Sequence, residues 1–171
     1  MTYTSNIKEL RDAYVKMLGT NMIIGESELV HPSYVEIIKQ MTSDEIKIIN
    51  CLPRKGLYEP VIDITVEKTH KSGSFTYYEN CSCLGYEAKC DYPDKANIYV
   101  NNLMRLGLVS IPPLSFMFDE WRYNKIYDLE SFKESIYIAE KDGNVILRKK
   151  MIGLTDYGDV LRKVCFDFNI Q

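Results

Sequence analysis

The chain has 171 residues, of which 46% are hydrophobic and 26% are charged, and its formal net charge at pH 7 is −3. This composition is typical of a globular domain and disfavours a dedicated nucleic-acid binder, which usually carries an excess of positive charge. The N-terminus lacks an apolar stretch behind a basic lead, and no segment approaches the roughly 18 apolar residues of a membrane span. We therefore expect a cytoplasmic protein with no signal peptide and no membrane span.

The first thirty residues are predicted to form one helix and a connector. Apolar residues recur at helical spacing over 6–18, Ser5 can cap the helix, and Gly19 can end it. We therefore divide the chain into an N-terminal segment, 1–30, and a domain over 31–171.

Two further helices are expected at the start of this domain. Pro32 stands at the first position of one helix, where proline is tolerated. Thr42 and Glu45 have the spacing of a capping box, in which each side chain bonds the other residue's backbone amide. Met41 and Ile46 stand at the flanking positions of a hydrophobic staple, so we expect the next helix to begin here.

A strand is predicted over 61–67, where apolar and polar residues alternate. The sequence at 71–74 indicates a turn into a partner strand over 75–78. A short helix is then expected over 81–88 and a better-defined helix over 94–106.

The C-terminal part contains a good hairpin signal. Asp142-Gly143-Asn144 lies between 136–140 and 145–151, two segments predicted to pair as strands. Thr155 is predicted to cap the last helix, and the aromatic stretch 112–127 fits no regular element.

This order of elements predicts an α+β, winged-helix-like domain preceded by N-terminal helices. The helix at 94–106 would be the recognition helix, and a short strand over 108–111 would follow it. The hairpin around Gly143 would be the wing.

Four sequence segments, which span most of the chain, resemble the Abi-alpha (abortive infection) family of bacterial proteins. The segments are KELRDAYVKMLG (8–19), HPSYVEIIKQMTSDEIKII (31–49), NNLMRLGLV (101–109) and IGLTDYG (152–158) with VLRKVC (160–165). The resemblance implies an association with phage defence. It implies no reaction, because the family has no established catalytic residues to carry over.

Five cysteines invite a test for a zinc site. Cys81, Cys83 and Cys90 could bind zinc with His70 as a fourth ligand, but their spacing does not match the paired ligands of zinc modules. Cys81 also lies on an apolar stripe, where a thiol is a small hydrophobic group. We expect reduced thiols and no bound metal.

The sequence contains no motif that indicates an enzyme. His31 precedes a helix-starting proline and has no nucleophile placed beside it by a recognisable motif. Of the carboxylate pairs, Asp44-Glu45 is used by the capping box, and Asp119-Glu120 lies in the unassigned stretch. Nucleotide-binding, metalloprotease and serine-hydrolase motifs are absent. We expect a non-enzymatic protein that needs no cofactor.

Two kinds of binding function stay open. The first is a protein-interaction module that uses an exposed aromatic surface over 116–121. The second is a nucleic-acid-binding regulator that uses polar residues of the recognition helix and the wing. Its candidate residues are Lys95, Asn101, Asn102, Arg105, Arg148, Lys149 and Lys150. A continuous basic stripe that joins Lys95, Arg105 and Lys149 would favour nucleic acid, and an apolar patch would favour a protein partner.

Overall fold

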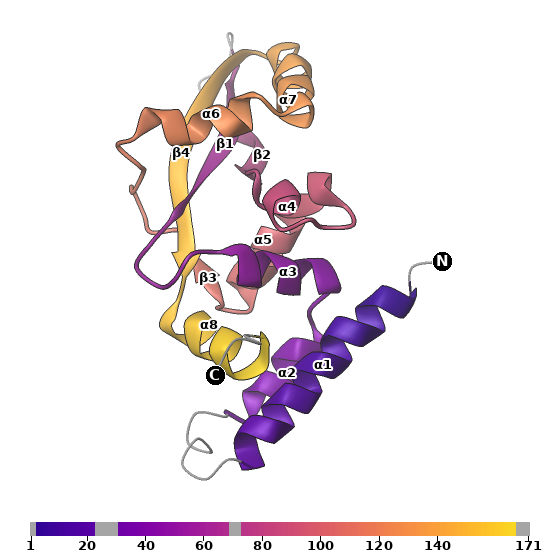
Figure 1. The fold of residues 1–171 in the computed structure, drawn as a ribbon. Helices are drawn as coiled ribbons and strands as arrows, with labels where there is room; N and C mark the ends of the chain where they lie inside the picture. The colour runs from indigo at the N-terminus through magenta and orange to yellow at the C-terminus, as the bar shows by residue number, and fades with distance from the viewer. Residues whose placement is uncertain (1–2, 23–30, 69–72, 167–171) are drawn as a thin grey trace.

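The computed structural model describes residues 3–22, 31–68 and 73–166 (Figure 1). The α-helices are α1 (Tyr3–Met22), α2 (Ser33–Lys39), α3 (Ser43–Cys51), α4 (Leu84–Glu87), α5 (Ala96–Arg105), α6 (Asn124–Tyr127), α7 (Glu130–Glu140) and α8 (Asp156–Leu161). The 3-10 helices η2 (Pro93–Lys95) and η3 (Glu120–Tyr123) lead into α5 and α6, and the π-helix η4 (Arg162–Phe166) continues α8. Among the described residues, no helix is long and apolar enough to cross a membrane.

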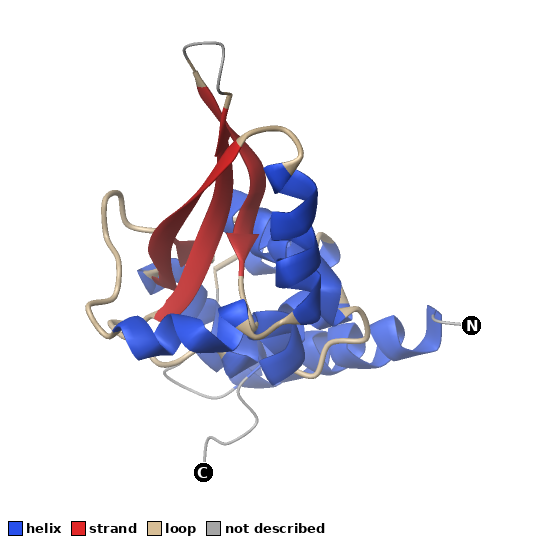
Figure 2. Ribbon diagram, turned by 90° about the horizontal axis from the view of Figure 1, so that it is seen from above, coloured by secondary structure: helices blue, strands red, loops and turns tan. Residues whose placement is uncertain are grey.

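The strands form one antiparallel sheet. Their order is β2 (Ser74–Cys81), β1 (Glu59–Glu67), β4 (Asn144–Leu154) and β3 (Val109–Ser110). β1 and β4 pair continuously from Glu59 opposite Ile152 to Glu67 opposite Asn144. Figure 2 shows the strands gathered on one side of the helices.

Two hydrophobic clusters lie at different ends of this sheet. The larger cluster joins α1, α2, α3, α5 and α8 around buried residues such as Ile38, Ile49 and Leu103. The smaller cluster lies where α6 and α7 cover the sheet, and it includes Ile64 and Phe132. Figure 1 shows β4 running from the end beside α7 to the end beside α8.

The strongest local signals in the sequence are confirmed. Thr42 accepts a hydrogen bond from the Glu45 amide at 3.3 Å, and Glu45 accepts one from the Thr42 amide at 2.6 Å. Thr155 caps α8 by accepting from the Gly158 amide at 2.9 Å. The strands over 61–67 and 75–78 and the helix over 94–106 are also present, although residues 71–72 of the predicted turn lie outside the described residues.

The predicted wing is wrong. Residues 136–140 belong to α7, and β4 pairs with β1 instead of with a neighbouring hairpin strand. Phe132, Ile136 and Ala139 follow helical spacing and turn toward the smaller cluster, so burial of this face favours a helix. The α+β class is therefore confirmed, but the winged-helix assignment is not.

Gly143 joins α7 to β4 instead of forming a hairpin tip. A β-carbon at this position would lie 2.3 Å from the Glu67 carbonyl oxygen, at the end of β1. Glycine is therefore required for a close approach between two backbones, which the turn signal alone did not reveal.

Candidate functional site

A hollow beside α5 brings together three of the seven residues predicted to bind nucleic acid. Asn101, Arg105 and Lys150 line an open space of about 590 Å³. Its other lining residues are Glu79, Asn80, Met104 and Ile111. Asn102, which bonds Arg105, lies next to the three predicted residues, while Lys95, Arg148 and Lys149 do not line this hollow.

Asn80 is the centre of a polar network beside this hollow. The residue is 3% exposed and has a φ of 56°, a left-handed conformation that few side chains other than asparagine adopt readily. Its amide group donates to Asn101 Oδ1 at 2.7 Å and accepts from Lys150 Nζ at 2.7 Å. Its backbone amide donates to Asp63 Oδ1 at 2.9 Å. The pairing of β1 with β2 is irregular here, and the network fills the irregularity.

The basic residues of β4 differ in their surroundings. Lys150 forms an ion pair with Asp63 at 2.7 Å. Lys149 forms an ion pair with Glu120 and lies over the Tyr123 ring, 5.5 Å from its centroid. Arg148 is exposed. Two of the three charges are therefore balanced within the fold.

Asn102 and Arg105 on α5 face α2 and α3. Asn102 donates to the Glu45 carboxylate at 2.8 Å and to the Gln40 carbonyl at 3.1 Å. Arg105 donates to the side-chain oxygens of Gln40 and Asn102. Burial raises the pKa of Glu45 despite these donors. The predicted recognition face thus joins α5 to the N-terminal helices.

Lys95 lies apart from these groups, with its ammonium 4.7 Å from the centroid of the Tyr92 ring. The described contacts of Lys95, Arg105 and Lys149 are to three different sets of neighbours. These contacts do not join the three residues into a basic stripe.

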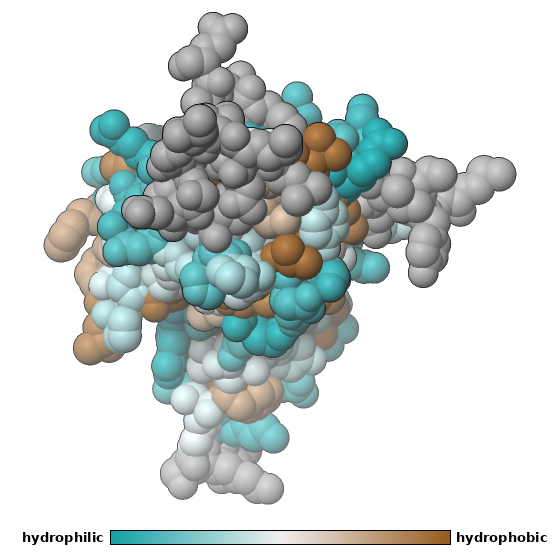
Figure 3. All heavy atoms as spheres, turned by 90° about the horizontal axis from the view of Figure 1, so that it is seen from below, coloured by the Kyte–Doolittle hydropathy of each residue, from teal (hydrophilic) through white to brown (hydrophobic). Residues whose placement is uncertain are grey.

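The segment from the end of β3 into η3 exposes large apolar side chains, as expected for the protein-interaction hypothesis. Leu114 is 102% exposed, Phe118 91%, Trp121 65% and Phe116 49%. The Phe116 and Phe118 rings contact each other, with centroids 5.6 Å apart. We call these four residues the apolar loop. In Figure 3 hydrophobic side chains reach the left edge of the view, the side on which Figure 1 places this segment.

The apolar loop is anchored at its base. The Met117 amide donates to the Tyr123 hydroxyl at 3.0 Å, and that hydroxyl donates to the Lys150 carbonyl at 2.9 Å. The Tyr123 side chain is fully buried in the smaller cluster. Leu114, at the other end of the loop, has a φ of 56°, which is strained for an ordinary side chain.

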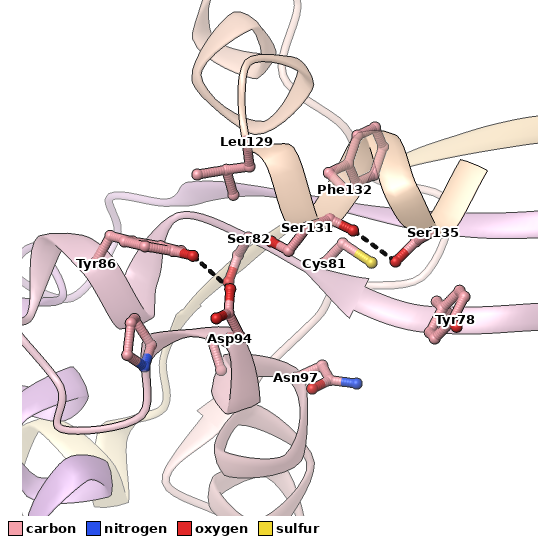
Figure 4. Close-up of a pocket in the computed structure, with 12 residues that line it drawn as sticks. Tyr78, Cys81, Ser82, Tyr86, Asp94, Asn97, Leu129, Ser131, Phe132 and Ser135 are labelled. Carbon is pink, nitrogen blue, oxygen red and sulfur yellow. Dashed lines mark hydrogen bonds between the residues drawn. The ribbon is translucent and has the colours of Figure 1, made fainter. Parts of the chain in front are cut away.

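A second hollow, of about 220 Å³, lies between the end of β2, the start of α5 and α7 (Figure 4). The Tyr86 hydroxyl donates to Asp94 at its rim, and Ser135 donates to the Ser131 carbonyl at 2.8 Å. Sequence reasoning missed this hollow, because its lining residues come from 78–97 and 129–135 and form no local motif.

Cys81, Cys83 and Cys90, the candidate zinc ligands of the sequence, are buried or half-buried thiols. Burial raises the pKa of Cys81 and of Cys83 to about 11, and that of Cys90 to about 12. Cys90 donates to the Asp44 carbonyl at 3.6 Å. Within the described ranges, no three His, Cys, Asp or Glu side chains are placed to hold a metal ion, and His70 lies outside those ranges. These thiols are protonated at neutral pH, which disfavours nucleophilic chemistry.

His31 lies at the start of α2. Its Nδ1 accepts from the Ser33 amide at 3.2 Å and is 2.6 Å from the Ser33 hydroxyl, which also bonds the Tyr157 hydroxyl. These contacts join two segments that carry the family resemblance, 31–49 and 152–158, and hold α2 against α8.

The Asp44 carboxylate has a structural role beyond the start of α3. It accepts from the amides of Asp91 and Tyr92, from the Tyr99 hydroxyl and from Lys47. Burial alone would raise the pKa of Asp44, but these donors more than offset it and leave the pKa below its usual value.

Two comparisons found similarity to known proteins, and a third found none. A family model described as abortive infection alpha matches residues 1–165. The solved structure of an uncharacterised protein from the hydrocarbon-degrading marine bacterium Alcanivorax borkumensis SK2 is similar, with 17% sequence identity and a TM-score of 0.53. The similarity covers 81% of this chain and 92% of that chain, and at this identity it shows the fold alone. No curated protein matches.

Proposed function

Because the chain belongs to the abortive infection alpha family, whose model matches residues 1–165, we propose that it is a non-enzymatic binding component of phage defence that recognises a protein partner. Membership of the family associates the chain with abortive infection. The mode of action is our inference from the surface of the molecule.

The exposed apolar loop carries this proposal. Burying a fully exposed leucine or phenylalanine contributes about 1.5–3 kcal/mol, and aromatic anchors dominate many protein interfaces. Leu114, Phe118 and Trp121 are all more than half exposed, so little of their surface is used by the fold. A partner with an apolar concave surface would bury them.

The anchoring of the loop supports binding rather than mere exposure. The bonds that join Met117, Tyr123 and Lys150 fix the base of the segment before a partner arrives. Pre-ordering lowers the entropy lost on association. The left-handed backbone at Leu114 is a further sign, because strain of this kind is retained at functional sites when the surrounding structure imposes it.

The polar residues favour a protein partner over nucleic acid. Lys150, Arg105 and Asn102 are engaged with other residues of the fold, and Lys149 is balanced by Glu120. Arg148 is the exposed cation of the predicted set on β4. It therefore gives the sharper test of the nucleic-acid alternative.

Photo-crosslinking tests the proposal. A photoreactive amino acid replaces Phe118 in one variant and Tyr137, a 66% exposed residue of α7, in a matched control. In infected cells of the host, we expect a discrete protein adduct from position 118 and not from position 137. Equal labelling at the two positions, or no adduct at position 118, would reject the apolar loop as the binding surface.

A second arm examines nucleic acid. Duplex DNA and RNA are titrated at low salt against the wild type and Arg148→Glu. We expect no binding by either protein. Binding by the wild type that Arg148→Glu weakens would favour the nucleic-acid alternative instead.

A further inference from the structure

The hollow shown in Figure 4 lies away from the apolar loop, and its walls are rich in hydroxyl groups. β2 and the segment after it supply Tyr78, Ser82 and Tyr86, and α7 supplies Ser131 and Ser135. A hydroxyl group both donates and accepts hydrogen bonds. A wall of this kind suits a ligand that itself carries several hydroxyl groups.

Ser82 supplies an independent sign of a ligand. The residue lines the hollow and is 7% exposed, yet its hydroxyl oxygen has no hydrogen-bond partner among the described residues. Buried polar groups in native proteins nearly always have partners, and an unpaired one destabilises the fold. The oxygen itself has almost no solvent-accessible surface in this structure, so a ligand hydroxyl would supply the missing partner once the Ser82 side chain turns toward the hollow.

The charges around the hollow restrict the ligand further. Asp94 is the charged residue among its lining residues, and no lysine, arginine or histidine is among them. Asp94 is exposed and accepts from the Tyr86 hydroxyl, so it forms the rim of the hollow, while Ser82 lies deeper. A carboxylate accepts from adjacent hydroxyl groups and repels phosphate. The site therefore favours a neutral ligand over a phosphorylated one.

Part of the wall is apolar. Leu129 and Phe132 lie close to Ser131 in the chain, Pro93 precedes Asp94, and Phe132 is 3% exposed. The hollow of about 220 Å³ exceeds an engineered cavity of about 150 Å³ that holds benzene, so one ring compound fits. The apolar wall would contact the C–H face of that ring.

We propose that this hollow binds the vicinal diol of a neutral sugar ring. Asp94 accepts from one or both hydroxyl groups of the diol in place of Tyr86. The Ser82 side chain turns toward the hollow and bonds a hydroxyl of the ring, and the side chains of Phe132 and Leu129 cover the ring face. Both a free monosaccharide and the ribose of a nucleoside carry this chemistry. The site does not depend on the partner surface proposed above.

Calorimetric titration of the purified chain tests the proposal. The probes are ribose, glucose, adenosine and uridine, each compared with its phosphorylated form. We expect saturable binding of at least one neutral probe and binding at least tenfold weaker for its phosphate. A preference for a nucleoside over both free sugars would show that the ligand is a nucleoside and that its base adds to the affinity. No binding of any neutral probe at millimolar concentration, or tighter binding of the phosphates, would overturn the proposal.

Variants separate a ligand contact from a structural role. Ser82→Ala removes an unpaired buried hydroxyl, so its unfolding midpoint without ligand should equal or exceed that of the wild type. Its affinity for the bound probe should fall at least tenfold, as should that of Asp94→Ala. Ser110→Ala, at an exposed serine of β3, should bind as the wild type does. Unchanged affinity in Ser82→Ala would refute the assignment, as would a lower midpoint without ligand.

Discussion

The start of α3 and the apolar loop reverse the usual placement of polar and apolar residues in opposite ways. At the start of α3, Asp44 and Glu45 are each 3% exposed, although charged side chains are seldom buried. In the loop, Leu114 and Phe118 are almost wholly exposed, although large apolar side chains are usually inside.

The difference lies in the partners that the fold provides. Asp44 accepts hydrogen bonds from two backbone amides, a tyrosine and a lysine, and Glu45 accepts from Thr42 and Asn102. The exposed side chains of the loop have no comparable set of contacts. We infer that the first region is specialised for stability, while the second is available for a partner.

Removing the Asp44 carboxylate should have the largest effect on stability. Asp44→Ala leaves the amides of Asp91 and Tyr92 and the Tyr99 hydroxyl without their acceptor, while Lys47 keeps its ion pair with Asp91. We expect the free energy of unfolding to fall by about 3 kcal/mol, because unpaired buried donors are costly. Urea denaturation measures the change. Asp44→Asn keeps one acceptor oxygen and should lose less, and a loss below about 1 kcal/mol in Asp44→Ala would contradict the comparison.

The same carboxylate predicts a dependence on pH. The donors around Asp44 hold its pKa below the unfolded value of about 4, so its contribution is present above that pH and is lost as the pH falls through the folded pKa. Glu45 acts in the opposite direction, because burial raises its pKa. We expect the stability difference between the wild type and Asp44→Asn to shrink below about pH 4. A difference that stays constant from pH 6 to pH 3 would show that Asp44 is not a titrating source of stability.

Loss of the capping box should have a smaller effect. Thr42→Ala removes the side-chain acceptor of the Glu45 amide, and a lost cap typically costs about 1 kcal/mol. Thr42→Ser keeps the hydroxyl and serves as the control. An unchanged denaturation midpoint in Thr42→Ala would show that the cap contributes nothing measurable.

Leu114→Gly should have the smallest effect on stability. The substitution removes a fully exposed side chain and relieves a left-handed backbone, worth roughly 1 kcal/mol, while the greater freedom of glycine in the unfolded chain opposes the gain. We expect a net change within about 0.5 kcal/mol of zero. A loss above 1 kcal/mol would show that Leu114 supports the fold after all.

Sequence signals predicted the structure where local and tertiary preferences agree. The capping box at Thr42 and the cap at Thr155 depend on residues three apart, so the sequence contains the whole interaction. The prediction of a strand over 136–140 was wrong because residues far away in β1 and β4 bury the apolar face of a helix there. The turn signal at Asp142-Gly143 fits both a hairpin between two strands and the observed connection from α7 to β4.

The candidate sites show the same limit. Exposure of the aromatic segment over 116–121 was expected from its composition, but its anchor through Tyr123 depends on Lys150, 27 residues away. The hydroxyl groups around Ser82 come together only when α7 lies near the end of β2. Likewise, the polar face of α5 is typical of a nucleic-acid contact in the sequence, but in the fold Asn102 donates to Gln40 and Glu45, which lie more than 50 residues earlier in the chain.

Protection of cells against phage tests the central claim most directly. Host cells lacking the gene are complemented with the wild type, with a Leu114→Gly and Phe118→Ser double variant, or with Tyr137→Ser, at matched protein levels. If the apolar loop is the binding surface, cells with the double variant form as many plaques as cells without the gene. Cells with the wild type or with Tyr137→Ser form fewer plaques. Undiminished protection by a folded double variant would contradict the account.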